Sequence, residues 1–223
     1  MDPPLPLPHP RPARALALAL LAALVFATLA ADLLLHGPVT RADVPISHWF
    51  GTHAQPWVTH AMLTVSALHA TVPLLVYAAA LALAFVVQRQ SQWVLPLVVA
   101  VPGGLLLNAA VKLVFHRARP TFAHPLVTLS SASFPSGHAA GATVWWGFVL
   151  AVWFAREADR RRRLVACLAV AALVLLTALS RVVVGAHYPS DVLAGIAEGT
   201  LWLVLCFSAA DAFARRNRQG GLA

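Results

Sequence analysis

Long apolar stretches, separated by short polar connections, follow one another along almost all of the 223 residues of the chain. A helix needs about 20 mostly apolar residues to cross the hydrocarbon core of a bilayer. Six stretches reach this length, and no soluble domain or low-complexity linker remains between them. The pattern therefore predicts an all-α, polytopic membrane helix bundle with six transmembrane helices. They are expected at residues 13–35, 57–87, 93–115, 138–155, 164–184 and 190–214.

The first apolar stretch has a second interpretation, a cleaved signal peptide, because Thr28, Leu29 and Ala30 offer small residues near its end. Its apolar run continues to Leu35, however, which is long for the apolar core of a signal peptide. We therefore expect a retained helix. The proline-rich residues 1–12 are expected to form a short disordered cytoplasmic tail, and residues 13–218 a single domain.

Arginines are concentrated in every second connection between the predicted helices. These connections all fall on one side if the chain crosses the membrane six times, and cytoplasmic loops are those that carry excess positive charge. Both termini are therefore predicted to be cytoplasmic, in an integral protein of a bacterial inner membrane. The arginines concerned are Arg11, Arg14, Arg89, Arg156, Arg160, Arg161, Arg162, Arg163, Arg215, Arg216 and Arg218.

The polar and aromatic residues 44–69 are predicted to lie on the outer side of the membrane. Trp49 and Trp57 fit an aromatic belt at the membrane interface. The histidines of this segment are expected to be interfacial polar residues, because no carboxylate or cysteine accompanies them at metal-ligand spacing. They are His48, His53, His60 and His69.

Composition supports the membrane assignment and disfavours other classes of protein. The chain is 60% hydrophobic and only 11% charged, which is more apolar than a soluble domain requires. Its formal charge of +8 does not indicate a nucleic-acid partner, because the arginines lie between apolar runs instead of along one face. Cys167 and Cys206 lie inside apolar runs without ligand spacing, so we expect small buried hydrophobic residues there.

Cations interrupt the apolar pattern at the predicted outer ends of two helices. Lys112, the only lysine of the chain, precedes Arg119 by seven residues. In a continuous helix they would be about 10 Å apart, so they reach one anion only if the chain bends near His116 or the side chains converge. Alone, Lys112 would be interpreted as a snorkelling lysine at a helix end. Arg181 has apolar neighbours and needs an anionic partner, and its planar guanidinium matches phosphate.

Two predicted helix starts carry histidines. Ser136 and Gly137 begin the fourth helix, where unpaired N–H groups and the helix dipole favour an anion. A simple N-cap would explain Ser136 but not His138, which is costly at a membrane boundary. His187 lies four residues before Asp191, whose carboxylate could keep one ring nitrogen protonated and leave the other free to attack phosphorus. Together with the cations, these residues predict phosphoryl chemistry at a membrane.

The three segments match the patterns K-x6-R-P, P-S-G-H and S-R-x5-H-x3-D at residues 112–120, 135–138 and 180–191. In this order they resemble the signature of the type 2 phosphatidic acid phosphatase family, lipid phosphatases related to vanadium haloperoxidases. One departure is Thr121 with Phe122, where many members repeat Arg-Pro. The departure leaves details of the substrate open.

The resemblance implies a role for each matching residue. His187 would be the nucleophile that forms a phosphohistidine, Asp191 would orient it, and His138 would be the general acid. Family members work without a metal, so neither a metal nor a cofactor is expected. The phosphate-binding residues implied are Lys112, Arg119, Ser136, Gly137 and Arg181.

The predicted function is hydrolysis of a lipid phosphate or diphosphate on the outer side of the membrane. A transporter or structural membrane protein is the alternative, and it would place charges near the middle of the membrane. A vanadium haloperoxidase would share the motifs. The haloperoxidases related to this family are soluble proteins, however, and the apolar stretches of this chain disfavour that alternative. Phosphatidate, phosphatidylglycerophosphate, undecaprenyl diphosphate and a lipid A phosphate all remain candidate substrates, and the oligomeric state stays open. Small residues favour close helix contact or a groove for a lipid tail, at Gly103, Gly104, Gly141, Gly195 and Gly199.

Overall fold

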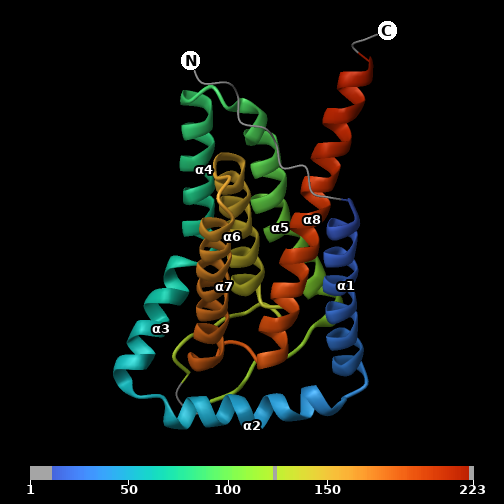
Figure 1. Ribbon diagram of the computed structural model, residues 1–223. Helices are drawn as coiled ribbons and strands as arrows, with labels where there is room; N and C mark the ends of the chain where they lie inside the picture. The colour runs from blue at the N-terminus through green and yellow to red at the C-terminus, as the bar shows by residue number, and fades with distance from the viewer. Residues whose placement is uncertain (1–11, 123–124, 221–223) are drawn as a thin grey trace.

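The computed structural model describes residues 12–122 and 125–220, and these ranges contain helices but no strand. The prediction of an all-α fold is thereby confirmed. The expected tail lies outside the described residues except for Pro12, the first residue of α1. The helices are α1 (Pro12–Leu34), α2 (Pro38–His53), α3 (Pro56–Leu68), α4 (Thr71–Val87), the 3-10 turn η1 (Ser91–Trp93), α5 (Val94–Phe115), α6 (Gly137–Arg156), α7 (Arg160–Val183) and α8 (Pro189–Gly220) (Figure 1).

Five helices of the described chain are long and apolar enough to cross a membrane: α1, α5 with its preceding turn, α6, α7 and α8. The helices α3 and α4 pass the same test together, but they are bent by 48° at the break between them. Counted as one broken span, the pair completes the six predicted spans. Pro73 explains the break, because it has no N–H to bond the carbonyl of His69 and its ring would clash there.

The direction of the chain alternates along the bundle, so its two ends have different chemistry. The beginning of α1 and the end of α8 lie at one end, where α6 also ends and α7 begins (Figure 1). This is the arginine-rich end. At the opposite end, called the motif end here, α2 crosses beneath the other helices, α5 and α7 finish, and α6 and α8 begin (Figure 1). The three sequence motifs therefore meet at one end of the bundle.

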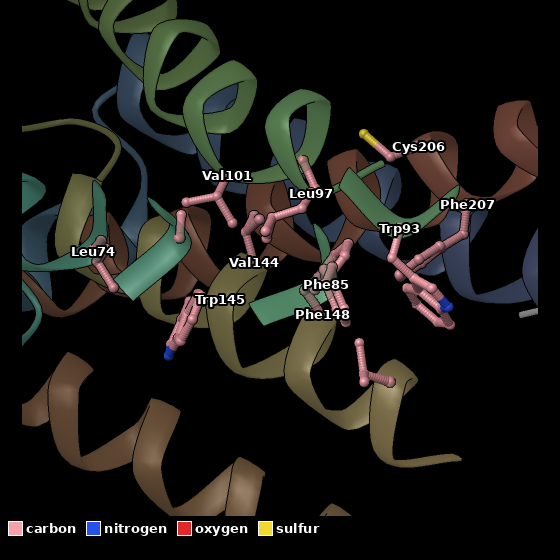
Figure 2. Close-up of a cluster of buried hydrophobic side chains, with 13 residues drawn as sticks. Leu74, Phe85, Trp93, Leu97, Val101, Val144, Trp145, Phe148, Cys206 and Phe207 are labelled. Carbon is pink, nitrogen blue, oxygen red and sulfur yellow. The ribbon is translucent and has the colours of Figure 1, made fainter. Parts of the chain in front are cut away.

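An apolar core holds α4, α5, α6 and α8 together. Trp93 and Phe148 are fully buried, with their rings in edge contact and centroids 5.8 Å apart. Phe148 also stacks on Phe207 of α8 at 5.5 Å, and Phe85 of α4 stacks on Trp93 (Figure 2). This packing fixes the four helices relative to one another, and the polar site at the motif end is built on them.

Helix α8 approaches α6 very closely, as the small residues predicted. A Cβ added to Gly195 would lie 2.5 Å from the backbone oxygen of Ser136, and one added to Gly199 would lie 2.7 Å from that of Ala140. Only glycine permits this approach. It brings the first turns of α6 and α8, with the second and third motifs, into direct contact.

Helix α2 was not predicted as a helix, because residues 44–69 were interpreted only as an outer polar segment. The structure divides this region into α2 and the half-span α3. In α2 the polar residues Asp43 and Ser47 are buried against the protein, whereas Val44, Ile46 and Trp49 are exposed. An outer face on which these apolar side chains alternate with exposed polar ones such as Arg41 and His53 suits a helix that lies in the membrane interface.

Two helix boundaries also differ from the prediction. Helix α7 begins at Arg160 and not at residue 164, because the side chain of Asp159 caps it by accepting the backbone N–H of Arg162 at 2.8 Å. Helix α8 continues beyond residue 214 to Gly220. Polar and charged residues extend both helices beyond their apolar stretches, and a search for apolar stretches does not include them.

Candidate active site

A cavity of about 580 Å³ opens between the helices at the motif end. Its polar lining includes five of the eight predicted site residues, namely Lys112, Arg119, Gly137, His138 and His187. Ser136, Arg181 and Asp191 are not among the lining residues, and each is at most 2% exposed. The apolar wall is formed by Leu74, Leu75, Leu105, Leu106 and Leu129.

The imidazole of His187 is held between a cation and a carboxylate. Its Nε2 lies 3.1 Å from Nη1 of Arg119, and a guanidinium has only donors. Nε2 therefore accepts this hydrogen bond with its lone pair, and the ring proton is on Nδ1. Nδ1 is 3.5 Å from Oδ2 of Asp191 and 3.4 Å from the hydroxyl of Ser133. The predicted pairing of His187 with Asp191 is thus present in the structure.

His187 is neutral near pH 7. Its side chain is 2% exposed, and this burial lowers the pKa of His187 to about 4, although the Asp191 carboxylate acts in the opposite direction. A neutral imidazole with a lone pair on Nε2 can act as a nucleophile. The turn that carries it depends on Gly185, whose φ of 72° lies in the left-handed region.

Arg119 and Lys112 are brought together by a bend in the chain. Helix α5 ends at Phe115, and His116 follows in the left-handed conformation with φ 46°. Both cations then donate to the carbonyl of Ala132, Lys112 at 2.6 Å and Arg119 at 3.2 Å. Of the two alternatives that the sequence left open, a bend near His116 or convergence of the side chains, the structure contains the bend.

Arg119 is fixed by several acceptors. Nε donates to the carbonyl of Ser131 at 2.8 Å, and Nη1 donates to the carbonyl of Ala186 at 2.7 Å. Burial lowers the pKa of Arg119, and Asp191 partly offsets the effect. The guanidinium is therefore held beside Nε2 of His187 before any substrate enters.

The start of α6 differs from an ordinary capped helix. Ser136 is at the N-cap position, but its side chain makes no capping hydrogen bond. Its buried hydroxyl has no partner among the described residues, and its backbone N–H donates to the carbonyl of Asp191 at 2.9 Å. The N-terminus of α6, where Gly137 and His138 line the cavity, is thereby suited to an anion.

Arg181 lies behind the cavity, and the broken span positions it. Its Nη1 donates to the hydroxyl of Ser66 in α3, whereas its buried Nε has no partner among the described residues. Ser66 was not singled out by sequence reasoning. Only the bend between α3 and α4 places this residue against α7.

Four further polar residues of the site were missed from the sequence. Arg117 donates to Asp191 Oδ1 at 2.5 Å and to Asp43 Oδ2 at 2.7 Å. Ser133 donates to Asp191 Oδ2 at 2.5 Å, and Ser190 donates to the carboxylate of Asp43. Arg117 could have been identified from the sequence, because it lies between Lys112 and Arg119 and outside the arginine-rich connections of the predicted cytoplasmic side. Asp43 and Ser133 gave none, because single polar residues in connections are usually solvated.

A buried polar pair lies deeper in the bundle. Asn108 of α5 donates to Glu198 of α8 at 2.7 Å, and a Cβ added to Gly137 would lie 2.9 Å from Oδ1 of Asn108. The pair therefore joins α5 to α8 and lies beside the start of α6. Glu198 lies inside a predicted span, which is a signal that could have identified it.

The described residues contain no group of three or more histidine, cysteine or acidic side chains that could hold a metal ion. Their cationic and histidine side chains suit an anion instead. Lys112 and Arg119 flank the cavity, Arg181 stands behind it, and a neutral imidazole faces into it. This arrangement can bind phosphoryl oxygens while Nε2 approaches phosphorus.

Fold and site together describe an all-helical protein with long apolar helices and a cavity lined by cations and histidines. The model of the PAP2 superfamily matches residues 93–215, which include every motif residue. The chain therefore belongs to the PAP2 superfamily and is a membrane phosphatase. Membership in this superfamily confirms the resemblance that the three motifs indicated. It also favours the predicted phosphatase over the alternative of a transporter or structural membrane protein.

Characterised relatives match over most or part of the chain. Phosphatidylglycerophosphatase B of Bacillus subtilis is 31% identical over 185 residues, covering 82% of this chain and 89% of the relative. An undecaprenyl-diphosphatase of the same species is 36% identical over 112 residues, covering 48% of this chain and 53% of that protein. The crystal structure of a PAP2-type phosphatidylglycerolphosphate phosphatase from Bacillus subtilis superposes with a TM-score of 0.74 and 30% identity, covering 89% of this chain and 96% of that one.

Proposed function

We propose that this protein removes the terminal phosphate of a membrane lipid through a phosphohistidine on His187. One observation carries the proposal. The neutral imidazole of His187 turns the lone pair of Nε2 toward Arg119 at the wall of a cavity that also presents Lys112 and His138. A nucleophile held among fixed cations suits attack on a phosphoryl group, because the cations neutralise the charge on its oxygens.

In the first step the phosphate enters the cavity and its oxygens bind Lys112, Arg119 and Arg181, with the N–H groups and hydroxyl at the start of α6. An oxygen takes over the Nη1 donor of Arg119, which frees the lone pair of Nε2. Nε2 then forms a bond to phosphorus as the bond from phosphorus to the lipid oxygen breaks. His138 donates its proton to that oxygen, so the lipid leaves as an alcohol or, from a diphosphate, as a monophosphate.

In the second step a water molecule attacks phosphorus, and His138 accepts a proton from it. The bond between phosphorus and Nε2 breaks, inorganic phosphate leaves, and both histidines return to their starting states. Asp191 stabilises the positive charge that His187 carries while it is bonded to phosphorus. The same two histidines thus complete both halves of the cycle.

The apolar wall of the cavity supports a lipid as the substrate. Five leucines line the same cavity as the cations, namely Leu74, Leu75, Leu105, Leu106 and Leu129. A head group would reach the cations while its tail remains against this wall. The named activities of the relatives favour a diacyl lipid with a terminal phosphate or an isoprenoid diphosphate.

The location of the site supports hydrolysis on the periplasmic side of a bacterial inner membrane. The site lies at the motif end, and most arginines lie at the opposite end of the bundle. Positive charge is retained on the cytoplasmic side of membranes. The catalytic cavity would therefore open toward the outer leaflet.

The test is phosphate release from phosphatidate, phosphatidylglycerophosphate and undecaprenyl diphosphate by detergent-purified protein. His187→Ala is expected to lower kcat by about a thousandfold or more and to abolish an acid-labile phosphoenzyme. His53→Ala is the matched control, because His53 is exposed on α2 and bonds only within its own helix. Activity of His187→Ala equal to that of the control would overturn the proposal.

A further inference from the structure

Helix α2 contributes a carboxylate to the motif end that none of the three motifs contains. Asp43 is 1% exposed and accepts from Nη2 of Arg117 at 2.7 Å and from the backbone N–H of Ser190 at 2.9 Å. Through Nη1, Arg117 donates to Oδ1 of Asp191 at 2.5 Å. A continuous chain of contacts therefore runs from α2 through Arg117 to the carboxylate behind His187.

We propose that Asp43 and Arg117 are positioning residues, which hold the Asp191 carboxylate, and through it the imidazole of His187, in the orientation for attack on phosphorus. This rests on the phosphohistidine chemistry proposed above. Neither Asp43 nor Arg117 lines the cavity. Both therefore act through Asp191 and not on the substrate.

The two oxygens of Asp191 have separate partners. Oδ1 accepts from Arg117, whereas Oδ2 accepts from the hydroxyl of Ser133 at 2.5 Å and from the backbone N–H of Tyr188 at 2.9 Å. Oδ2 is also the oxygen that faces Nδ1 of His187, at 3.5 Å. Because a carboxylate is planar, the bond from Arg117 to Oδ1 fixes the direction in which Oδ2 points.

Arg117 is itself held from three sides. Asp43 binds Nη2, Asp191 and Ser190 bind Nη1, and the guanidinium lies over the ring of Tyr188 at 4.3 Å. Burial opposes its charged form, but the two carboxylates outweigh burial and raise the pKa of Arg117, so it remains a cation. With side chains only 8%, 1% and 0% exposed for Arg117, Asp43 and Asp191, water screens these charges weakly.

The position of α2 follows from the same contacts. Asp43 bonds both the backbone and the hydroxyl of Ser190 in the first turn of α8. Phe122 packs beside Gly51 of α2 and beside Gly185, because a Cβ added to either glycine would lie 2.5 to 2.6 Å from its ring. An interfacial helix is thereby fixed against the turn that carries His187.

The closing experiment compares Arg117→Gln, Arg117→Lys and Asp43→Asn in the lipid phosphatase assay. A misplaced nucleophile lowers kcat by up to about a hundredfold, whereas the phosphate-binding cations keep KM within about twofold. We expect a loss of this size for Arg117→Gln, a loss of about tenfold for Asp43→Asn, and partial recovery with Arg117→Lys. The double variant Arg117→Gln with Asp43→Asn should lose no more kcat than Arg117→Gln alone, since both residues act through the same series of contacts.

A change in pH dependence separates positioning from a general structural role. Lys112, Arg119 and His138 also line the cavity beside His187, and these variants leave them unchanged. Loss of the Arg117 charge leaves Asp191 free to stabilise the imidazolium, so the pKa of His187 should rise by about 1 unit. The acid limb of kcat/KM would then move to higher pH by the same amount. NMR titration of histidine-labelled protein in detergent measures this pKa without turnover.

Arg41→Gln is the matched control, because Arg41 is an exposed cation on the same helix. It should keep the kcat and acid limb of the unmodified protein. Gel filtration establishes that each variant is folded, and Asp43→Asn retains the shape of the native residue. Native kcat and an unshifted His187 titration in Arg117→Gln would overturn the inference and leave the proposed function intact. Absence of phosphate release by the unmodified protein would instead refute the proposed function. The NMR titration of His187 would still show whether Arg117 acts on His187 through Asp191.

Discussion

The contact between Gly195 and Ser136 sets how closely α6 and α8 approach each other, and Gly195→Ala should perturb it measurably. A Cβ at residue 195 would lie 2.5 Å from the carbonyl oxygen of Ser136 and 3.1 Å from Cβ of Ala139. The first obstacle is backbone and cannot rotate away. Helix α8, which carries Asp191 in its first turn, must therefore move away from the start of α6, which carries His138.

The size of the movement follows from the contact distance. Ordinary van der Waals contact begins at 3.4 Å, so the helices must separate by about 0.9 Å. Overpacking of this kind typically costs about 1 to 3 kcal/mol, and alanine recovers up to about 1 kcal/mol through its higher helix propensity. The net loss is therefore about 0 to 3 kcal/mol, which leaves the protein folded. Because misplacement of catalytic groups by about 1 Å can lower the rate a hundredfold, kcat/KM should fall by about 10- to 100-fold.

The assay is phosphate release by purified Gly195→Ala, with the melting temperature recorded in the same detergent. Gly103→Ala is the matched control, since its added Cβ would meet a side chain, the ring of Trp202 at 3.0 Å, and not the backbone. The control should keep activity within about twofold of the unmodified protein. If Gly195→Ala is equally active, close approach of α6 and α8 does not set the catalytic geometry, and the reasoning is refuted.

Four further outcomes are expected. The acid limb of kcat/KM should lie near pH 4, because the attacking form of His187 is neutral and its lowered pKa of about 4 keeps it neutral above that pH; a limb near pH 6.5 would contradict this. His138→Ala should slow hydrolysis of an alkyl phosphate more than that of an activated aryl phosphate, and equal losses would argue against the acid role. Shortening the lipid tail should lower kcat/KM steeply, at about 0.8 kcal/mol per buried CH₂, whereas equal values for a soluble phosphate ester would rule out the lipid. In a cysteine-free background, an impermeant thiol reagent on intact cells should label Thr128→Cys but not Arg161→Cys, and the reverse would invert the topology.

The membrane fold and most of the site could be predicted from the sequence, because both depend on local patterns. A run of about 20 apolar residues must be helical in a bilayer, where each backbone polar group needs an internal partner. Alternation of arginine-rich connections then places the three motifs at one end. The pairs Lys112 with Arg119 and His187 with Asp191 are separated by only seven and four residues. Their proximity therefore needed only a bend near His116 and the short turn that leads into α8.

The tertiary structure decided the contacts that join residues far apart in the chain. Asp43 meets Arg117 and Ser190, Ser66 meets Arg181, and these pairs are separated by 74 to 147 positions. Nothing in the local sequence specifies such partners, because the same polar residues would be solvated in an isolated segment. The closely packed α6 and α8, the bend between α3 and α4, and α2 across the motif end bring these residues out of water. Once buried, each polar group must find a partner, and the packing of the helices determines which one it finds.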